Sequence, residues 1–366
     1  MNVKSNLKTP LHAEHLARHA RMAPFAGWDM PIQYTSIVTE HQQTRQQATV
    51  FDISHMGEFD ISGPTAEQDL DRLLTQRIAT LANGQCRYGY LLNEAGGVID
   101  DLTCYRRADD RFYLVVNAAN RAAAADWIKA HCQSRTIFAD VSDQTAKIDI
   151  QGPAARALME EALGCALPDL NYFRATDWTY DGVSSWLSRT GYTGEWGYEW
   201  YLPTEAAVTC WQRLLAPGAL QPAGLGARDT LRLEMGYPLH GHELQPDRSP
   251  VAVAGSAFMH LDKPFIGRDQ VQRVLDQGPD QQLLGLRLES RRAARAGDTV
   301  WREGTQIGTV TSGSYAPSVG VAIALAYIDT AHAQPNSACT IEVRGQHLPA
   351  TLTKPPFYKE GTARAT

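Results

Sequence analysis

Two consecutive aspartates, Asp100 and Asp101, lie in the segment GGVIDDLTCYR, which reads as a β-strand entered through a glycine turn. Consecutive strand residues point to opposite faces, so only one of these carboxylates can face a pocket, and the other should face solvent or cap a turn. A carboxylate in a pocket can transfer a proton or stabilise developing positive charge. A solvated pair in a turn is the ordinary alternative, and the spacing alone leaves both open.

A second segment, GYTGEWGYEW at residues 191–200, combines four aromatic residues, two glutamates and three glycines. Aromatic rings can stack on a planar ligand, glycines let the backbone approach it, and a carboxylate can accept its N–H groups. The same composition also suits a packed β-hairpin. Downstream, Arg228 precedes a helical run and could hold an anionic group bidentately, although it could equally pair with Asp229.

The segment HGHE, from His240 to Glu243, is the most metal-like cluster, because imidazole and carboxylate are ordinary zinc ligands. The two histidines are only two residues apart and no third ligand is evident, so we interpret the cluster, and also His55, as ordinary loop histidines and predict no metal. The segment GLGARD, residues 224–229, lacks the third glycine and the preceding strand of a dinucleotide loop.

Other chemistry is excluded by what the chain lacks. It contains no GxSxG elbow, P-loop or HExxH motif, and its six cysteines are scattered singly, as is usual for reduced cytosolic thiols. The net charge of −6 is spread along the chain, so no basic stripe predicts nucleic-acid binding. No apolar run predicts a membrane span or a signal peptide, and we expect a cytoplasmic protein.

Apolar residues at helical spacing predict helices over residues 11–21 and 36–50, and Pro24, Gly27 and Pro31 predict an irregular loop between them. From residue 50 the pattern alternates as in a strand, and a helical run then follows Pro64. Three β-rich runs come next (QCRYGYLLN, GGVIDDLTCYRR and DRFYLVVNA), before an alanine-rich helix. This order predicts a compact antiparallel sheet with helices on one face.

The same order then begins again. Residues 149–153, DIQGP, repeat residues 60–64, DISGP, and each strand turns through Gly-Pro into a helix. The echo suggests two related α+β units, although common turn chemistry could also produce it. Beyond a linker at residues 243–250, short strands separated by glycines predict a β-barrel or sandwich.

Along nearly its whole length, the chain resembles the T-protein family of the glycine cleavage system. The matching segments, in the family's order, are TPLHAEH, RMAPFAGWDMPIQY, FDISHMGE, LLNEAGGVIDDL, LVVNAANR, QGPAA, RTGYTGE, GLGARDTLRLE, PLHGHEL, LDKPFIGR, GTVTSG, IALAYI and KPPFY. The resemblance implies an α+β, three-domain cloverleaf around a central folate pocket. We expect a discontinuous first domain (1–50 with 138–245), a second α+β domain (51–137) and a C-terminal barrel-like domain (246–366).

The resemblance further implies an aminomethyltransferase that uses tetrahydrofolate and a lipoylated H-protein, with no metal. Asp101 matches the family's catalytic carboxylate. The other matching positions imply contacts to folate: Met56, Tyr88, Tyr105, Asn117, Phe173, Tyr192, Glu199 and Arg228. A lipoyl thioaminal can lose thiolate to give an iminium-like carbon, which a folate amine captures as ammonia leaves, and a nearby carboxylate can assist this chemistry without a metal.

Three departures from the family pattern concern the donor rather than folate: Trp196, Ala252, and the stretch APSVGVAIALAY, where the family has a stretch like SPTLGKGIALAY. Trp196 replaces an acidic residue, and Ala252 stands where a glutamate is expected. They leave open a folate-dependent demethylase of a small methylated amine or sulfonium compound. A non-catalytic folate-binding protein, such as an iron–sulfur assembly factor, is a further alternative, although the KGCYxGQE-like loop of those proteins is absent.

Overall fold

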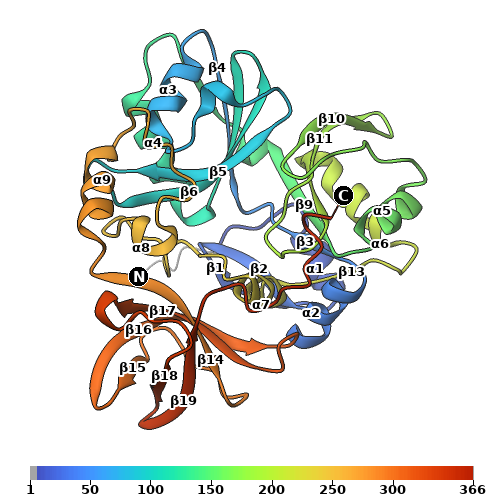
Figure 1. The fold of residues 1–366 in the computed structure, drawn as a ribbon. Coiled ribbons are helices and arrows are strands. Elements are labelled where there is room, and N and C mark those ends of the chain that lie inside the picture. The colour runs from blue at the N-terminus through green and yellow to red at the C-terminus, as the bar shows by residue number, and fades with distance from the viewer. Residues whose placement is uncertain (1–5, 366) are drawn as a thin grey trace, which may run out of the picture.

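The structure is a computed structural model that describes residues 6–365. Three lobes surround the long helix α7 (Leu225–Met235), as Figure 1 shows: two sheet-and-helix units and a barrel coloured orange to red. The predicted α+β class is therefore confirmed, and the C-terminal region is a closed barrel rather than a sandwich.

The first sheet has six strands in the order β10-β11-β12-β9-β3-β13. Helices α5 (Ala155–Leu163) and α6 (Ala207–Leu215) pack on it around buried Trp200 and Trp211. Its strands are β3 (Thr49–Asp52), β9 (Thr145–Gln151), β10 (Ala175–Tyr180), β11 (Val183–Ser188), β12 (Gly197–Pro203) and β13 (Gln221–Pro222).

The second sheet has five strands in the order β5-β6-β7-β4-β8. Helices α3 (Ala66–Leu73) and α4 (Arg121–His131) cover one face, as the sequence predicts. Its strands are β4 (Gly57–Ser62), β5 (Cys86–Leu92), β6 (Val98–Ala108), β7 (Arg111–Val116) and β8 (Ile137–Asp140).

The two sheets share one order of elements: a strand, a Gly-Pro turn, a helix, a three-stranded meander and a second helix. In each, the last meander strand pairs antiparallel with the first strand, β7 with β4 and β12 with β9. At both turns the glycine has positive φ, +108° at Gly63 and +142° at Gly152, and an added Cβ would lie within 2.4 Å of a backbone oxygen. The DISGP and DIQGP segments therefore need glycine for the same steric reason.

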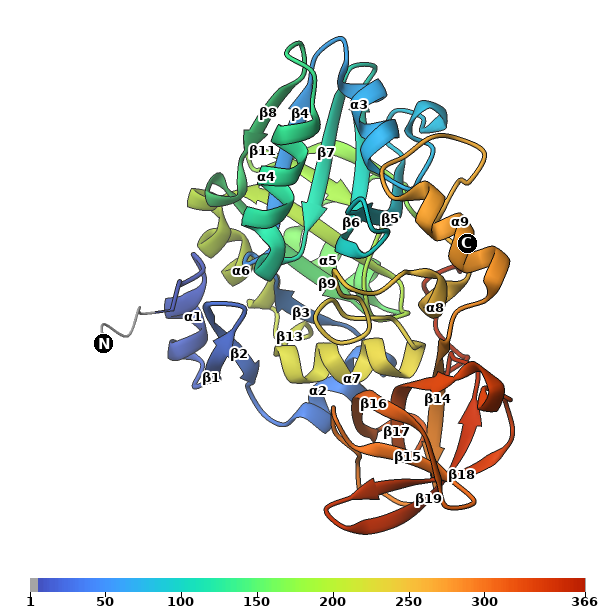
Figure 2. The same cartoon turned by 90° about the vertical axis from the view of Figure 1, so that its left-hand side faces the viewer.

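The barrel is formed by β14 (Gln281–Leu288), β15 (Thr299–Arg302), β16 (Thr305–Ala316), β17 (Val321–Asp329), β18 (Ala338–Val343) and β19 (Gln346–Thr353). Before it, α8 (Val251–Ala254) and α9 (Arg268–Gln277) pack against Leu92 and Val98 of the second sheet. A helix of ten residues here was not expected from the sequence. In Figure 2 these helices lie between the second sheet and the barrel.

The N-terminal region differs most from expectation. Helices α1 (His12–Ala17) and α2 (Ile37–Gln46) are shorter than predicted, and the residues between them form a hairpin, β1 (Arg21–Phe25) and β2 (Trp28–Gln33), rather than an irregular loop. The prolines in these strands hid the hairpin, because proline lacks a donor for the strand ladder.

The single predicted strand after residue 50 is two strands in different sheets, β3 and β4, joined by a turn at residues 53–56. The expected boundaries at 50/51 and 137/138 fall inside β3 and β8, while the strand pairing keeps each of those strands whole within one sheet. Strand pairing does not by itself define domains, so the domain division remains a prediction. None of the helices within residues 6–365 is long and apolar enough to cross a membrane.

Candidate functional site

Strand β6 separates the two neighbouring aspartates as the alternation of a strand requires. Asp100 is completely buried on the face that also carries Leu102 and Cys104, whereas Asp101 lies on the other face with Thr103 and remains partly exposed. Asp100 accepts hydrogen bonds from the backbone and side-chain nitrogens of Asn117, at 2.9 and 2.8 Å. Asp100 therefore caps the turn that begins at Asn117, which is one of the two alternatives expected for it.

Asp101 is held by two neutral donors that the sequence had singled out. Its Oδ2 accepts from the Tyr88 hydroxyl at 2.9 Å, and its Oδ1 accepts from Asn117 Nδ2 at 3.0 Å. Burial raises the pKa of Asp101, although these two hydrogen bonds oppose the shift. Burial and the neighbouring Asp101 also raise the pKa of Asp100. A raised pKa favours proton transfer near neutral pH, so Asp101 has the environment of a general acid or base.

Tyr105 lies four residues beyond Asp101 on the same strand and joins the two sheets. Its hydroxyl lies 3.3 Å from Thr190 Oγ1 and 3.1 Å from the Tyr201 hydroxyl, both in the first unit. Met56 and Phe173 pack against the cluster that contains Tyr105. The structure therefore brings these three predicted residues together at the junction of the sheets.

Glu199, on β12, is almost fully buried and is held by a cation. Its Oε1 lies 3.0 Å from Nζ of Lys147, and its Oε2 accepts from the Thr190 hydroxyl. Because Thr190 also contacts Tyr105, Glu199 is connected by hydrogen bonds to the second sheet. Lys147 Nζ also lies 3.8 Å from the sulfur of Met56.

Arg228 is positioned by the packing of helix α7. The helix begins after Gly224, where an added Cβ would lie 2.3 Å from the backbone of Ile32, so the GLGARD glycines serve packing rather than nucleotide binding. The guanidinium of Arg228 pairs with Asp149, and not with the adjacent Asp229. It also lies 5.2 Å from the ring centroid of Tyr192.

Tyr192 is held by residues that directly follow helix α7. Its ring stacks on Tyr237 with centroids 5.7 Å apart, and its hydroxyl donates to the Pro238 carbonyl. Burial, with the Asp101 carboxylate as a further cause, raises the pKa of Tyr192. The set of predicted site residues therefore has two parts. Asp101 is in contact with Tyr88 and Asn117. The second part lies at the junction of the two sheets and contains Met56, Tyr105, Phe173, Glu199, Arg228 and Tyr192. Whether these residues bind folate stays a prediction.

Sequence reasoning missed Lys147 and Asp149, the partners of Glu199 and Arg228. Both lie on one face of β9, and their exposed fractions are 1% and 0%. A signal was present, because AKIDIQ places charges at alternate positions of an otherwise apolar strand. Buried charged residues at that spacing need partners, so they indicate a polar site.

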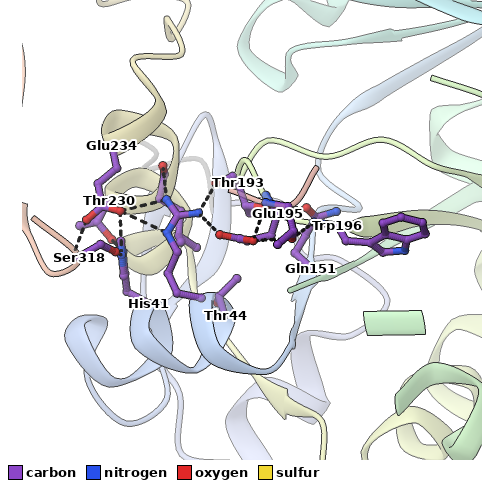
Figure 3. A network of polar contacts seen from close by, with 12 residues as sticks. His41, Thr44, Gln151, Thr193, Glu195, Trp196, Thr230, Glu234 and Ser318 are labelled. Carbon is purple, nitrogen blue, oxygen red and sulfur yellow. Dashed lines mark hydrogen bonds and ion pairs between the residues drawn. The ribbon is translucent and has the colours of Figure 1, made fainter. Parts of the chain in front are cut away.

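The loop at residues 191–196 is fixed by a polar network, shown in Figure 3. Arg45 of α2 donates to the Thr193 carbonyl and to Glu195, both at 2.7 Å, and to Glu234 of α7 at 3.0 Å. Near the C-terminus, Thr362 donates its hydroxyl to Glu195 Oε2 at 2.6 Å. The network therefore ties the loop that carries Tyr192 to the helix that carries Arg228.

The remaining candidates lie outside this set. His240 Nε2 bonds the Val98 carbonyl and His242 Nδ1 bonds the Thr311 carbonyl, both at 3.0 Å, so the two imidazoles have separate partners. Within residues 6–365, no group of three or more His, Cys, Asp or Glu residues could hold a metal ion. Trp196 packs under Arg189, 3.1 Å from the guanidinium carbon to the ring centroid, and Ala252 lies in α8.

Comparison with known proteins agrees with this architecture. Residues 11–263 match the model of the GCVT N-terminal domain, and residues 281–359 match the glycine cleavage T-protein C-terminal barrel domain. The chain is 42% identical to the aminomethyltransferase of Synechococcus elongatus, over 97% of both chains. It is 41% identical to that of Moorella thermoacetica, over 96% of this chain and 98% of the relative.

A solved structure shows the same fold. The crystal structure of glycine cleavage system aminomethyltransferase T from Bartonella henselae superimposes with a TM-score of 0.93 at 33% identity. The match covers 98% of this chain and 99% of the other. The resemblance inferred from the sequence is therefore confirmed, and the chain belongs to the glycine cleavage T-protein family of aminomethyltransferases.

Proposed function

We propose that this chain transfers the methylene carbon of an aminomethyl group, carried on the dihydrolipoyl arm of an H-protein, to tetrahydrofolate. The observation that carries the proposal is Asp101, a carboxylate of raised pKa held by Tyr88 and Asn117 beside a buried aromatic and charged cluster. Membership of a family of aminomethyltransferases supports the same reaction.

The proposed reaction balances without an oxidant or reductant. The carbon–sulfur and carbon–nitrogen bonds of the aminomethyl group break, and two carbon–nitrogen bonds to folate form. The sulfur leaves as the lipoyl thiol, the amino group leaves as ammonia, and the two folate nitrogens each lose a proton. The protein must therefore accept and return protons beside those nitrogens, which a carboxyl group can do.

The residues present fit tetrahydrofolate. The half-buried side chains of Tyr192, Met56 and Phe173 offer surfaces for a planar heterocycle. The aromatic cluster around Tyr105, against which Met56 and Phe173 pack, is itself buried. Glu199 is a buried acceptor for ring N–H groups, and Arg228 is a cation for an anionic tail. Tetrahydrofolate would supply the two amine nitrogens that receive the carbon.

Asp101 has the central part in this proposal. Its raised pKa lets it take a proton from a folate nitrogen and pass it to the departing group, while its negative form stabilises positive charge on the carbon being transferred. Tyr88 and Asn117 hold the carboxylate in one orientation, so that little rearrangement is needed during the reaction. We place this activity in the cytoplasm.

The test is titration calorimetry with tetrahydrofolate under anaerobic conditions, followed by addition of lipoylated H-protein, glycine decarboxylase and glycine. We expect folate binding, then release of ammonia with equal formation of methylenetetrahydrofolate. Binding without turnover would favour the demethylase or the folate-binding protein considered above. No binding would overturn the proposal.

A further inference from the structure

Lys147 is the most unusual side chain in the candidate site, because a lysine is seldom buried. It is 1% exposed in the middle of β9. Its Nζ lies 3.0 Å from Glu199 Oε1 and 5.0 Å from the centroid of the Tyr201 ring. Removing an ammonium group from water is costly unless an anion compensates, so the contact with Glu199 is what permits this burial.

The strand register explains why Glu199 needs this cation. Asp149 on β9 lies directly opposite Glu199 on β12, which places two carboxylates on adjacent strands. Two buried carboxylates so close would keep one of them protonated. Arg228 pairs with Asp149, and Lys147 pairs with Glu199. The four side chains together carry two positive and two negative charges when both carboxylates are ionised. Burial and Glu199 raise the pKa of Asp149 to about 6, although Arg228 opposes the shift.

The hydrogen bonds of Glu199 show what its ionisation provides. Its Oε1 pairs with the Lys147 ammonium group. Its Oε2 accepts hydrogen bonds from the Thr190 hydroxyl and, at 3.5 Å, from the Tyr201 hydroxyl. An ionised carboxylate has about four lone-pair positions and donates nothing, so it can still accept N–H groups from a ligand. A protonated Glu199 would instead present a hydroxyl donor to them.

We propose that Lys147 is a positioning residue, which holds Glu199 as an ionised hydrogen-bond acceptor for the ligand. This inference rests on the proposed function, because it takes the ligand to be a folate with ring N–H groups. It adds a requirement for a cation that the sequence analysis did not include. On the same strand, the anion Asp149 pairs with the cation Arg228.

The electrostatics of Glu199 support the proposal. Burial alone would raise its pKa, yet Lys147, the Thr190 hydrogen bond and Arg228 together hold the pKa of Glu199 below its usual value. The other charged or titratable groups that face it come from five elements: Asp149 of β9, Tyr201 of β12, Tyr105 of β6, Cys86 of β5 and Glu58 of β4. None of these five is a cation, so Lys147 and Arg228 are the cations that, with the Thr190 hydrogen bond, offset the burial.

The experiment is calorimetric titration of Lys147→Met with 5-methyltetrahydrofolate, an air-stable probe, at pH 7 and pH 9. Without the ammonium group, Glu199 should be protonated at pH 7, and the affinity should fall about tenfold relative to the unchanged protein, as one charged hydrogen bond becomes a neutral one. At pH 9 the difference should shrink, because Glu199 ionises again. An unchanged affinity, or the same loss at both pH values, would overturn the inference.

Three further variants separate positioning from general damage. Lys147→Arg should restore most of the affinity, and Lys147→Met should add no loss in a Glu199→Gln background. The matched control is Lys263→Met, which removes a lysine that is 4% exposed and donates to the Leu74 carbonyl, away from Glu199. The control should leave the affinity unchanged.

The role of Lys147 can also be tested if the protein binds no folate. In that case the proposed function fails, and stability to urea provides the readout. Lys147→Met should lose stability as the pH rises from 7 to 9, because the unpaired Glu199 must ionise while buried, and adding Glu199→Gln should remove this dependence. Parallel pH profiles for the single and double variants would overturn the role of Lys147.

Discussion

The two sheets have the same order of elements but use opposite means to hold a carboxylate of the candidate site. In the second sheet, Asp101 is held by a phenol and an amide, and burial raises its pKa. In the first sheet, Glu199 is held by Lys147, and its pKa is lowered. The neutral donors of Asp101 leave it able to exchange its proton, whereas Lys147 favours the ionised form of Glu199.

A second difference lies at the edge of each sheet. After its second helix, the second sheet adds β8 directly beside β4. In the first sheet, β3 from the N-terminal region occupies the corresponding place beside β9, and β13 pairs with the other edge of β3. The chain then passes from β3 to β4 through residues 53–56, so one turn joins the sheets and carries His55 and Met56 into the junction. This asymmetry places the candidate site between the two units.

The largest effect is expected on turnover, from a change at Asp101, the carboxylate that can exchange its proton. Asp101→Asn should lower turnover by about 10²- to 10⁴-fold, the usual contribution of an acid–base group, while folate affinity stays within about tenfold. Single-turnover kinetics and calorimetry measure the two quantities. The matched control is Asp69→Asn, which changes a buried aspartate of α3 bonded to Gln133 and Thr136. It should cost stability without changing turnover, and near-normal turnover of Asp101→Asn would remove Asp101 from the mechanism.

The turn between the sheets should make stability depend on pH. Burial lowers the pKa of His55 from 6.5 to about 4. The unfolded chain therefore binds a proton that the folded chain rejects, and stability is complete above pH 6.5 and is lost as the pH falls toward 4. The shift corresponds to about 3 kcal/mol. In urea titrations, the free energy of unfolding of His55→Gln should depend less on pH between pH 4 and 6.5 than that of the unchanged protein. An equal dependence on pH in the two proteins would contradict the assignment of this effect to His55.

A change at Glu199, the carboxylate held by Lys147, should affect folate affinity more than the chemical step. Glu199→Ala should weaken tetrahydrofolate binding by about 1–3 kcal/mol, because ligand N–H groups would be buried without an acceptor. Calorimetry checks this, with Glu160→Ala as a control on the surface of α5. If Glu199→Ala binds as well as the unchanged protein, folate does not contact this side of the junction.

The smallest effect concerns the contact between the C-terminal residues and the loop at 191–196. Thr362 donates to Glu195 and accepts from the Trp196 backbone at 2.9 Å. Thr362→Val should cost about 1–2 kcal/mol of stability, because it removes both hydrogen bonds of the hydroxyl and each usually contributes about 1 kcal/mol. Hydrogen exchange should quicken at Glu195 and Trp196, but not in the second sheet. Equal exchange in both proteins would show that the contact does not order the loop.

Local patterns in the sequence determined much of this protein. Alternation in GGVIDDLTCYR placed Asp100 and Asp101 on opposite faces, and the Gly-Pro echo marked two strand-to-helix turns, since these features depend only on neighbouring residues. The ordered series of motifs indicated the family and its fold, and both are confirmed. The hairpin after α1 escaped prediction because its prolines resemble loop punctuation.

Tertiary structure decided which charges meet. Lys147 and Glu199 are 52 positions apart, and Asp149 and Arg228 are 79 apart. They pair because β9 lies beside β12 and because α7 packs against the first unit. No local pattern encodes such a pairing, since it depends on strand register and on burial, which removes the water that would otherwise solvate each charge. The sequence therefore identified the carboxylates, and only the fold determined that Asp101 has neutral partners while Glu199 has a cation.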